Sequence, residues 1–294
     1  MHKPVILVLG TTGQTGSKVL AHLDEAPGDY AIRICSRRQQ QVDEWTSRGR
    51  DAVRLDLDDP ATFGPALNSV DRMFVISGYT VDMLFQIKTL VDAAIKCGVS
   101  HIVHQGVFAN WDTTDPHFIW HQLVESYIKA SGIAWTHLHP NYFMENLLGL
   151  TALQKGSFPM FVNNKAVGWI ALDDVAAVAV RVLCEGPQKH SGKDYWLSTD
   201  SLTGDQAAEL LTDVLGQTVV CDHKTPDELA TLMQGAGVEP NYAAGVVDFM
   251  RQVIDGRMAY VATIRDDVPY VTGRPSISFR EWCQQKREAL LQGI

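Results

Sequence analysis

The sequence predicts an α/β fold built on a doubly wound parallel sheet, with a smaller, mainly helical lobe toward the C-terminus. Three observations carry this prediction: short apolar runs alternate with helix-like stretches in the first half, a glycine-rich turn follows the first run, and helix signals crowd together after Pro140. The 294 residues suffice for a large domain that carries a smaller one. We expect the larger domain over residues 1–150 and the smaller substrate lobe over residues 151–294, with some strands of the second segment returning to the main sheet.

The strands of the sheet are expected at six apolar runs that are rich in valine, isoleucine and leucine. The runs cover residues 4–9, 31–36, 51–56, 71–77, 101–106 and 134–139. The stretches between them carry helical periodicity, and residues 80–98 are an example. This alternation is typical of βαβ units, which place helices on both faces of a parallel sheet.

The second half of the chain begins with one more strand and helix and then becomes richer in helix-start signals. The stretch GWIALDDVAAVAVRVLCEG predicts a strand followed by a helix. Thr225 with Glu228, and Ser278 with Glu281, have the spacing of a capping box. These signals place short helices in the smaller lobe.

The overall composition excludes several classes of protein. The formal charge of −9 argues against a nucleic-acid binder, which needs a basic face. No apolar stretch approaches the roughly 20 residues of a membrane span. The five cysteines are far apart and form no C-x-x-C pair, which favours reduced, mostly buried thiols in a cytoplasmic protein. The oligomeric state stays open.

The glycine-rich turn joins the first expected strand to the first expected helix. Gly10, Gly13 and Gly16 have the spacing G-x-x-G-x-x-G. In this context the first glycine permits a tight turn, the second lets the backbone approach a pyrophosphate, and the third lets helix and strand pack closely. A glycine-rich turn without a ligand is the alternative. The position of the motif favours a Rossmann-type domain that binds NAD(P).

The end of the second expected strand indicates which dinucleotide is preferred. An NAD-binding protein tends to carry an acidic residue there, whereas this chain has Ser36, Arg37 and Arg38. The planar guanidinium of arginine suits a 2′-phosphate. NADP(H) is therefore expected in preference to NAD(H), unless the two arginines only solvate a loop.

Four segments together resemble the NmrA-like, atypical branch of the short-chain dehydrogenases. They are LGTTGQTG (9–16), SRR (36–38), RLDLDDP (54–60) and SGIAWTHLHPNYFMENLL (131–148). The branch includes triphenylmethane, azo and quinone reductases alongside non-catalytic NADP-sensing regulators. The resemblance extends over nearly the whole chain.

The resemblance implies two sets of contact residues at the carboxyl ends of the strands, where ligands of open α/β sheets bind. The expected cofactor residues are Gly10, Thr12, Gly13, Gln14 and Thr15 at the pyrophosphate, Arg37 at the 2′-phosphate, Asp56 and Leu57 beside the adenine, and Ser77, Gly78, Gln105, Gly106 and Val107 on the ribose and nicotinamide side. The expected walls of the substrate pocket are Asn141, Tyr142, Phe143 and Asn146. For Phe143, packing in the core of the smaller lobe is the alternative.

The chain departs from the family pattern at the catalytic helix. Typical short-chain dehydrogenases carry Tyr-x-x-x-Lys there, and this sequence has His117 and His121 at the two positions. Residues four apart lie on one helical face. Three interpretations remain open: the pair lines the active site, with His121 holding the ribose and His117 donating a proton; the pair binds a metal, although no third ligand is evident; or both are polar helix residues without a role.

The sequence as a whole predicts an NADPH-dependent oxidoreductase that transfers hydride to a conjugated, electron-poor acceptor. A quinone, an azo compound or a triphenylmethane dye fits this description, because such acceptors need little protonation during hydride transfer. The alternative is a non-catalytic regulator that senses NADP(H) and reports to a protein partner. Neither function requires a metal.

Overall fold

A seven-stranded sheet forms the centre of the computed structural model, which describes residues 3–149 and 151–294. The strand order is β10-β6-β5-β4-β1-β2-β3, and every neighbouring pair is parallel. This is the predicted doubly wound order, and the Rossmann-type fold class is confirmed. The strands are β1 (Val5–Val8), β2 (Ala31–Ser36), β3 (Asp51–Arg54), β4 (Arg72–Ile76), β5 (His101–Gln105), β6 (Ala134–Pro140) and β10 (Lys193–Leu197).

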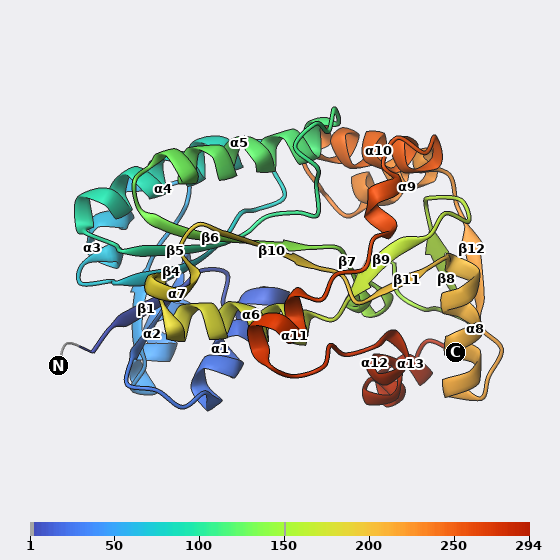
Figure 1. Ribbon diagram of the computed structural model, residues 1–294, viewed down its shortest axis with the longest axis horizontal. Helices are drawn as coiled ribbons and strands as arrows, with labels where there is room; N and C mark the ends of the chain where they lie inside the picture. Colours follow the sequence, from blue (N-terminus) through green and yellow to red (C-terminus); the bar gives the residue numbers. More distant parts are fainter. Residues whose placement is uncertain (1–2, 150) are drawn as a thin grey trace.

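Helices cover both faces of the sheet, as Figure 1 shows. Successive strand residues point to opposite faces, so Met73 and Val75 join one buried cluster while Phe74, between them, joins the other. The helices of the first face are α3 (Phe63–Leu67), α4 (Met83–Cys97) and α5 (Pro116–Ala130). Those of the second face are α1 (Gln14–Glu25), α6 (Leu172–Glu185) and α11 (Asp267–Thr272). The remaining helices of this part are α2 (Gln39–Ser47), α7 (Pro187–His190) and the short 3-10 turn η1 (Pro60–Thr62).

The smaller lobe combines helices with two small sheets at one end of the main sheet (Figure 1). One sheet has the order β11-β9-β7, and the other pairs β8 with β12 in parallel. Its strands are β7 (Tyr142–Phe143), β8 (Ser157–Met160), β9 (Val167–Ile170), β11 (Asp200–Leu202) and β12 (Val220–His223). Its helices are α8 (Gly204–Leu215), α9 (Pro226–Gly235), α10 (Pro240–Ile254), α12 (Phe279–Gln285) and α13 (Arg287–Leu291), with the 3-10 turns η2 (Met144–Leu148) and η3 (Ala259–Ala262).

The local signals of the second half agree with the structure. The predicted strand and helix after residue 166 are β9 and α6. Capping boxes are present at Thr225 with Glu228 and at Ser278 with Glu281, which confirms both helix starts. The predicted boundary at residue 150 lies outside the described residues. Both α6 and β10 come from the second segment of the chain and pack with the main sheet.

The thiols are more accessible than the sequence suggests. All five cysteines are free; Cys35 and Cys283 are buried, whereas Cys97, Cys184 and Cys221 are only half-buried. The prediction of mostly buried thiols is therefore wrong for three of them.

Among the described residues, every helix is too short or too polar to cross a lipid bilayer.

Candidate cofactor and active site

The turn between β1 and α1 has a shape that only glycine allows at two positions. Gly10 has a φ of +70°, and a Cβ added there would lie 2.8 Å from the Cγ2 atom of Ile76. A Cβ on Gly16 would lie 2.2 Å from the carbonyl oxygen of Gly10. The backbone amide of Gly13 donates to that same oxygen at 2.8 Å. The first turn of α1 is thus pressed directly against the end of β1.

The N-terminus of α1 is free to bind an anion. Gly13 is the N-cap, no side chain of the described ranges caps the helix, and its first turn holds no acidic residue. Thr12, Gly13 and Gln14 are exposed, whereas Thr15 is buried. The first N–H groups of a helix have no partner within it and carry the positive end of its dipole. These N–H groups suit a pyrophosphate.

A hydrogen bond connects this turn to the end of β2, where Arg37 follows. The hydroxyl of Thr11 donates to the carbonyl oxygen of Cys35 at 3.0 Å. The side chain of Arg37 is exposed, and its guanidinium has no partner among residues 3–149 and 151–294. Arg38 differs, because its guanidinium donates to Oε1 of Gln41 at 3.3 Å. Arg37 is therefore the arginine available to a phosphate.

The predicted adenine residues follow β3. The carboxylate of Asp56 accepts from the backbone amide of Asp58 at 3.2 Å and pairs with Arg54 at 3.6 Å. Leu57 is half-buried and packs against the core. The side chain of Asp56 is thus occupied in its own turn, which leaves Leu57 and the backbone of the turn to contact an adenine.

The ends of β4 and β5 adjoin the glycine turn and contain an unpaired polar atom. Ile76 pairs with Gln105 in the sheet, so Ser77 and Gly78 lie beside Gly106 and Val107. Gln105 is 8% exposed, yet its Oε1 atom has no hydrogen-bond partner in the described chain. A buried acceptor without a partner is costly. Together with the open N-terminus of α1, this atom fits a dinucleotide whose ribose hydroxyl donates to it.

His117 and His121 lie one turn apart on α5, and both have an unpaired ring nitrogen. The two rings are 5.3 Å apart and meet edge to face. Nε2 of His117 is 2.9 Å from the hydroxyl of Tyr242 on α10. Nδ1 of each histidine is buried and lacks a partner among the described residues. The structure therefore brings the predicted pair together and leaves at least one nitrogen of each ring without a hydrogen-bond partner in the described chain.

Burial keeps both histidines neutral. It lowers the pKa of His121 to about 4, with a smaller contribution from the charge of His139. The pKa of His117 is held well below its ordinary value, first by burial and then by His121. At neutral pH each ring holds a single proton, so it can donate or accept a hydrogen bond, but imidazolium is not available as an acid.

Tyr242 is a site residue that sequence reasoning missed. Its hydroxyl reaches His117 from 125 positions away in the sequence. A Cβ added to Gly245 on the same helix would lie 3.0 Å from the backbone nitrogen of His117, so glycine lets α10 pack tightly on the start of α5. Burial raises the pKa of Tyr242. A tyrosine therefore lies beside the position of the missing family tyrosine, but a different helix supplies it, and no local motif marks it.

The α5-facing side of the sheet holds further buried imidazoles. Nδ1 of His104 and Nδ1 of His137 are 3.2 Å apart, and burial lowers the pKa of both. His139 has charged partners, since its Nε2 is 3.0 Å from Asp194 and its Nδ1 is 3.5 Å from Glu125. Burial alone would lower the pKa of His139, but the hydrogen bond to Asp194 and the charges of Glu125 and Asp194 raise it.

The structure offers His117 and His121 no third metal ligand among the described residues. Within the described ranges, the groups with metal-binding spacing are Glu125, His139 and Asp194, and a second one in the smaller lobe. Neither group contains His117 or His121.

The predicted pocket residues have different environments. The side-chain amide of Asn141 donates to the carbonyl oxygen of Val261 at 2.8 Å and accepts from the amide of Tyr142 at 3.0 Å, so it holds its own segment in place. Phe143 packs against the core that α1 and α6 share. Tyr142 meets Trp169 edge to face, and Asn146 is half-buried. Of the four, Asn141 and Phe143 have evident packing roles.

The pocket segment nevertheless lies beside the cofactor turn. A Cβ added to Gly149, which ends η2, would lie 3.6 Å from Nε2 of Gln14. The side chain of Gln14 therefore bridges the glycine turn and the segment that follows β6. A ligand on the turn would border the predicted substrate pocket.

The His139–Asp194 pair makes stability depend on pH. Because the folded pKa of His139 is raised, its stabilising contribution is fully present below the unfolded pKa of about 6.5 and is lost as pH rises through the folded pKa. We expect Asp194→Asn to cost about 1–2 kcal/mol of unfolding free energy near pH 5.5 and less near pH 9.5. Lys129 also pairs with Asp194, at 3.2 Å. Urea unfolding at the two pH values measures the difference.

Asp24→Asn is the control for this experiment. Asp24 pairs with Arg50 at 2.7 Å and has no histidine partner among the described residues, so the cost of its substitution should not depend on pH in this way. An equal loss for Asp194→Asn at both pH values would contradict the assigned role of His139.

The comparisons with known proteins agree with this geometry. The model of the NmrA-like family matches residues 2–263. The NAD(P)H azoreductase of Xenophilus azovorans is 32% identical over 285 residues, which cover 95% of this chain and 97% of the relative. The triphenylmethane reductase of Citrobacter sp. superposes with a TM-score of 0.80 at 23% identity, covering 98% of this chain and all of that one. An NADPH-dependent quinone oxidoreductase of Escherichia coli, complexed with NADPH, has a TM-score of 0.78 at 24% identity, covering 96% and 98%. The protein therefore belongs to the NmrA-like family.

Proposed function

We propose that this protein is an NADPH-dependent reductase that delivers hydride to a conjugated, electron-poor acceptor such as a quinone, an azo compound or a triphenylmethane dye. The observation that carries the proposal is the open N-terminus of α1 next to the unpaired guanidinium of Arg37. The name of the azoreductase relative, which matches over nearly the full length, supports the same chemistry. A cytoplasmic location suits its free thiols.

The chain offers partners for each polar part of the cofactor. The N–H groups of the first turn of α1 would hold the pyrophosphate, Arg37 would hold the 2′-phosphate, and Oε1 of Gln105 would accept from a hydroxyl on the ribose and nicotinamide side. His121 would hold the nicotinamide ribose through its unpaired Nδ1, the task of lysine in typical short-chain dehydrogenases. When bound, the nicotinamide supplies the hydride.

Proton transfer has a small part in this mechanism. His117 is neutral and keeps the hydroxyl of Tyr242 in place through their 2.9 Å contact. A cationic or quinoid acceptor takes hydride without prior protonation, so solvent can complete the reaction. The site selects such acceptors because it lacks the Tyr-x-x-x-Lys acid that a simple ketone requires.

A non-catalytic NADP(H) sensor is the second candidate. The chain lacks the Tyr-x-x-x-Lys pair, and its two buried histidines are neutral, so it has no evident proton donor. This favours the sensor, because binding of NADP(H) alone needs no proton donor. The sensor binds NADPH without oxidising it in the presence of any acceptor.

Fluorescence of the nicotinamide distinguishes the two functions. We expect the purified protein to bind NADPH more tightly than NADH and to oxidise it when a quinone or a triphenylmethane dye is added. The preference for NADPH follows from the proposed contact with the 2′-phosphate. The oxidation is expected because these acceptors take hydride without a protein acid. Heat-denatured protein is the control for direct reduction. Tight binding with no oxidation across an acceptor panel would replace the reductase by the sensor.

Arg37→Gln tests the choice between the two cofactors. Loss of a charge-assisted pair with the 2′-phosphate should raise the Kd for NADPH about 10- to 100-fold and leave the Kd for NADH nearly unchanged. Arg38→Gln is the matched control, since Arg38 is already engaged with Gln41. If Arg38→Gln has the larger effect, Arg37 is not the phosphate ligand.

His121→Ala tests the ribose contact. We expect a roughly 5- to 100-fold loss of NADPH affinity, because the variant removes a buried acceptor that meets a ribose hydroxyl. Turnover should fall with it. Ser126→Ala is the control, since Ser126 is exposed on the same helix. Unchanged affinity and turnover in a folded His121→Ala protein would assign no cofactor role to His121.

A further inference from the structure

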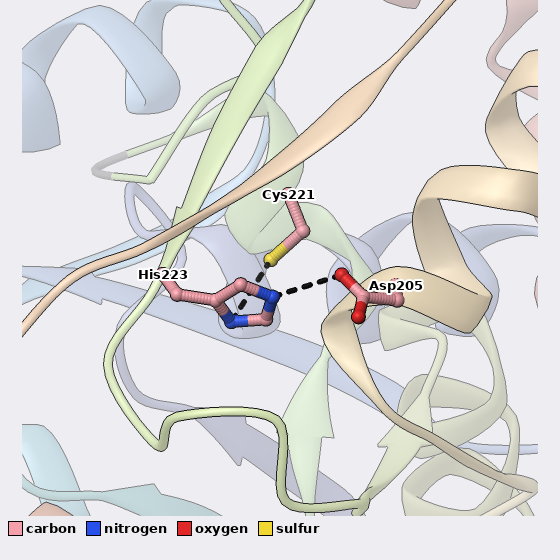
Figure 2. A group of neighbouring side chains, drawn as sticks. All are labelled: Asp205, Cys221 and His223. Atoms are coloured by element: carbon pink, nitrogen blue, oxygen red, sulfur yellow. Dashed lines mark hydrogen bonds and ion pairs between the residues drawn. The ribbon is translucent and has the colours of Figure 1, made fainter.

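Three side chains of different chemistry meet in the smaller lobe, away from the cofactor site. Figure 2 shows Asp205 from α8 with Cys221 and His223 from β12. Nε2 of His223 is 2.8 Å from Oδ1 of Asp205, and Nδ1 of the same ring is 3.9 Å from Sγ of Cys221. One ligand atom from each of the three residues lies within 4.8 Å of the other two.

The local structure holds the three side chains in position. Cys221 and His223 are two apart on a strand, so both point to the same face. Gly204 brings the start of α8 close, since a Cβ there would lie 2.3 Å from Sγ of Cys221. The side-chain amide of Asn164 donates to Oδ2 of Asp205 at 2.8 Å and orients its carboxylate. Such an outer partner is typical of metal ligands.

We propose that Asp205, Cys221 and His223 bind a divalent transition metal ion of the zinc class, with a fourth position open to water. Thiolate, imidazole and carboxylate are the three ligand types that zinc takes in proteins. Bonds of about 2.0–2.3 Å at tetrahedral angles place ligand atoms roughly 3.3–3.7 Å apart. The imidazole binds an ion through one nitrogen only, so the 2.8 Å contact at Nε2 and the 3.9 Å contact at Nδ1 are not both separations between ligands of one ion. One ligand atom of each residue lies within 4.8 Å of the other two, so rotation of the side chains is needed to bring all three onto one ion.

The charges around the thiol favour a cation over a nucleophile. The same residue types form nucleophilic triads, but here the carboxylate of Asp205 contacts the imidazole and Asp222 adjoins Cys221 in the strand, so negative charge gathers where a cation would bind. Lys224 offsets Asp222 in part, at 3.2 Å. His223 and Asp205 are accessible, with 32% and 53% of their side chains exposed, so an ion can enter.

Cobalt titration of the reduced, chelator-treated full-length protein tests the site. We expect one equivalent of Co²⁺ to produce a thiolate-to-cobalt charge-transfer absorption, and Zn²⁺ to abolish it by displacement. Cys221→Ser should lose the absorption. His223→Gln and Asp205→Asn should weaken Co²⁺ binding at least tenfold. Cys97→Ser is the matched control, because Cys97 is also half-buried but belongs to no metal-binding group in the described chain, and it should keep the absorption.

Thermal melting separates loss of the site from loss of the fold. Without metal, Cys221→Ser and the native protein should melt at similar temperatures, and Zn²⁺ should raise the Tm of the native protein only. Absence of a thiolate absorption at millimolar Co²⁺ would overturn the proposal. The same absorption in Cys221→Ser would also overturn it, because another thiol would then be the ligand.

Discussion

The contact between β1 and α1 through the glycine turn is the constraint on which the rest of the site depends. The carbonyl oxygen of Gly10 accepts from Gly13, and Gly16 lies so close to it that a side chain cannot fit. This contact fixes the direction of α1 and leaves its N-terminus open beside the ends of β2 and β4. Thr11 extends the constraint to β2 and positions the loop that carries Arg37. The proposed phosphate contacts follow from these few backbone distances.

The second constraint is the polar surface beneath α5. A parallel sheet covered on both faces usually carries aliphatic side chains, yet His104, His137 and His139 occupy one face of β5 and β6. Burial lowers the pKa of His104 and His137, which lack a carboxylate partner among the described residues, so both rings are neutral. Burial also acts to lower the pKa of His139, but Glu125 and Asp194 have the larger effect and raise it. The pKa of the same chemical group is thus shifted in opposite directions within one layer, according to whether an acid is within reach.

The sequence predicted the parts of the structure that depend on local patterns. The six strands and the turn at Gly10 follow from apolar runs and glycine spacing, and the capping boxes at Thr225 and Ser278 follow from contacts within one helical turn. It did not predict Tyr242, which meets His117 only because α10 folds back over α5. It also did not predict that the side-chain amide of Asn141 donates to the carbonyl oxygen of Val261, because the two residues lie 120 positions apart.

The contact between α10 and α5 also suggests how the family can change its substrates while keeping its cofactor. The proposed phosphate contacts come from the turn after β1 and the loop after β2, within the first 40 residues, where strand ends leave little freedom. Tyr242 and Gly245, in contrast, reach the catalytic helix from the smaller lobe. A substitution on α10 therefore alters the wall next to His117 without moving the glycine turn. In the proposed function, acceptor choice therefore depends on the packing of the smaller lobe, whereas the proposed cofactor site depends on the backbone of the larger one.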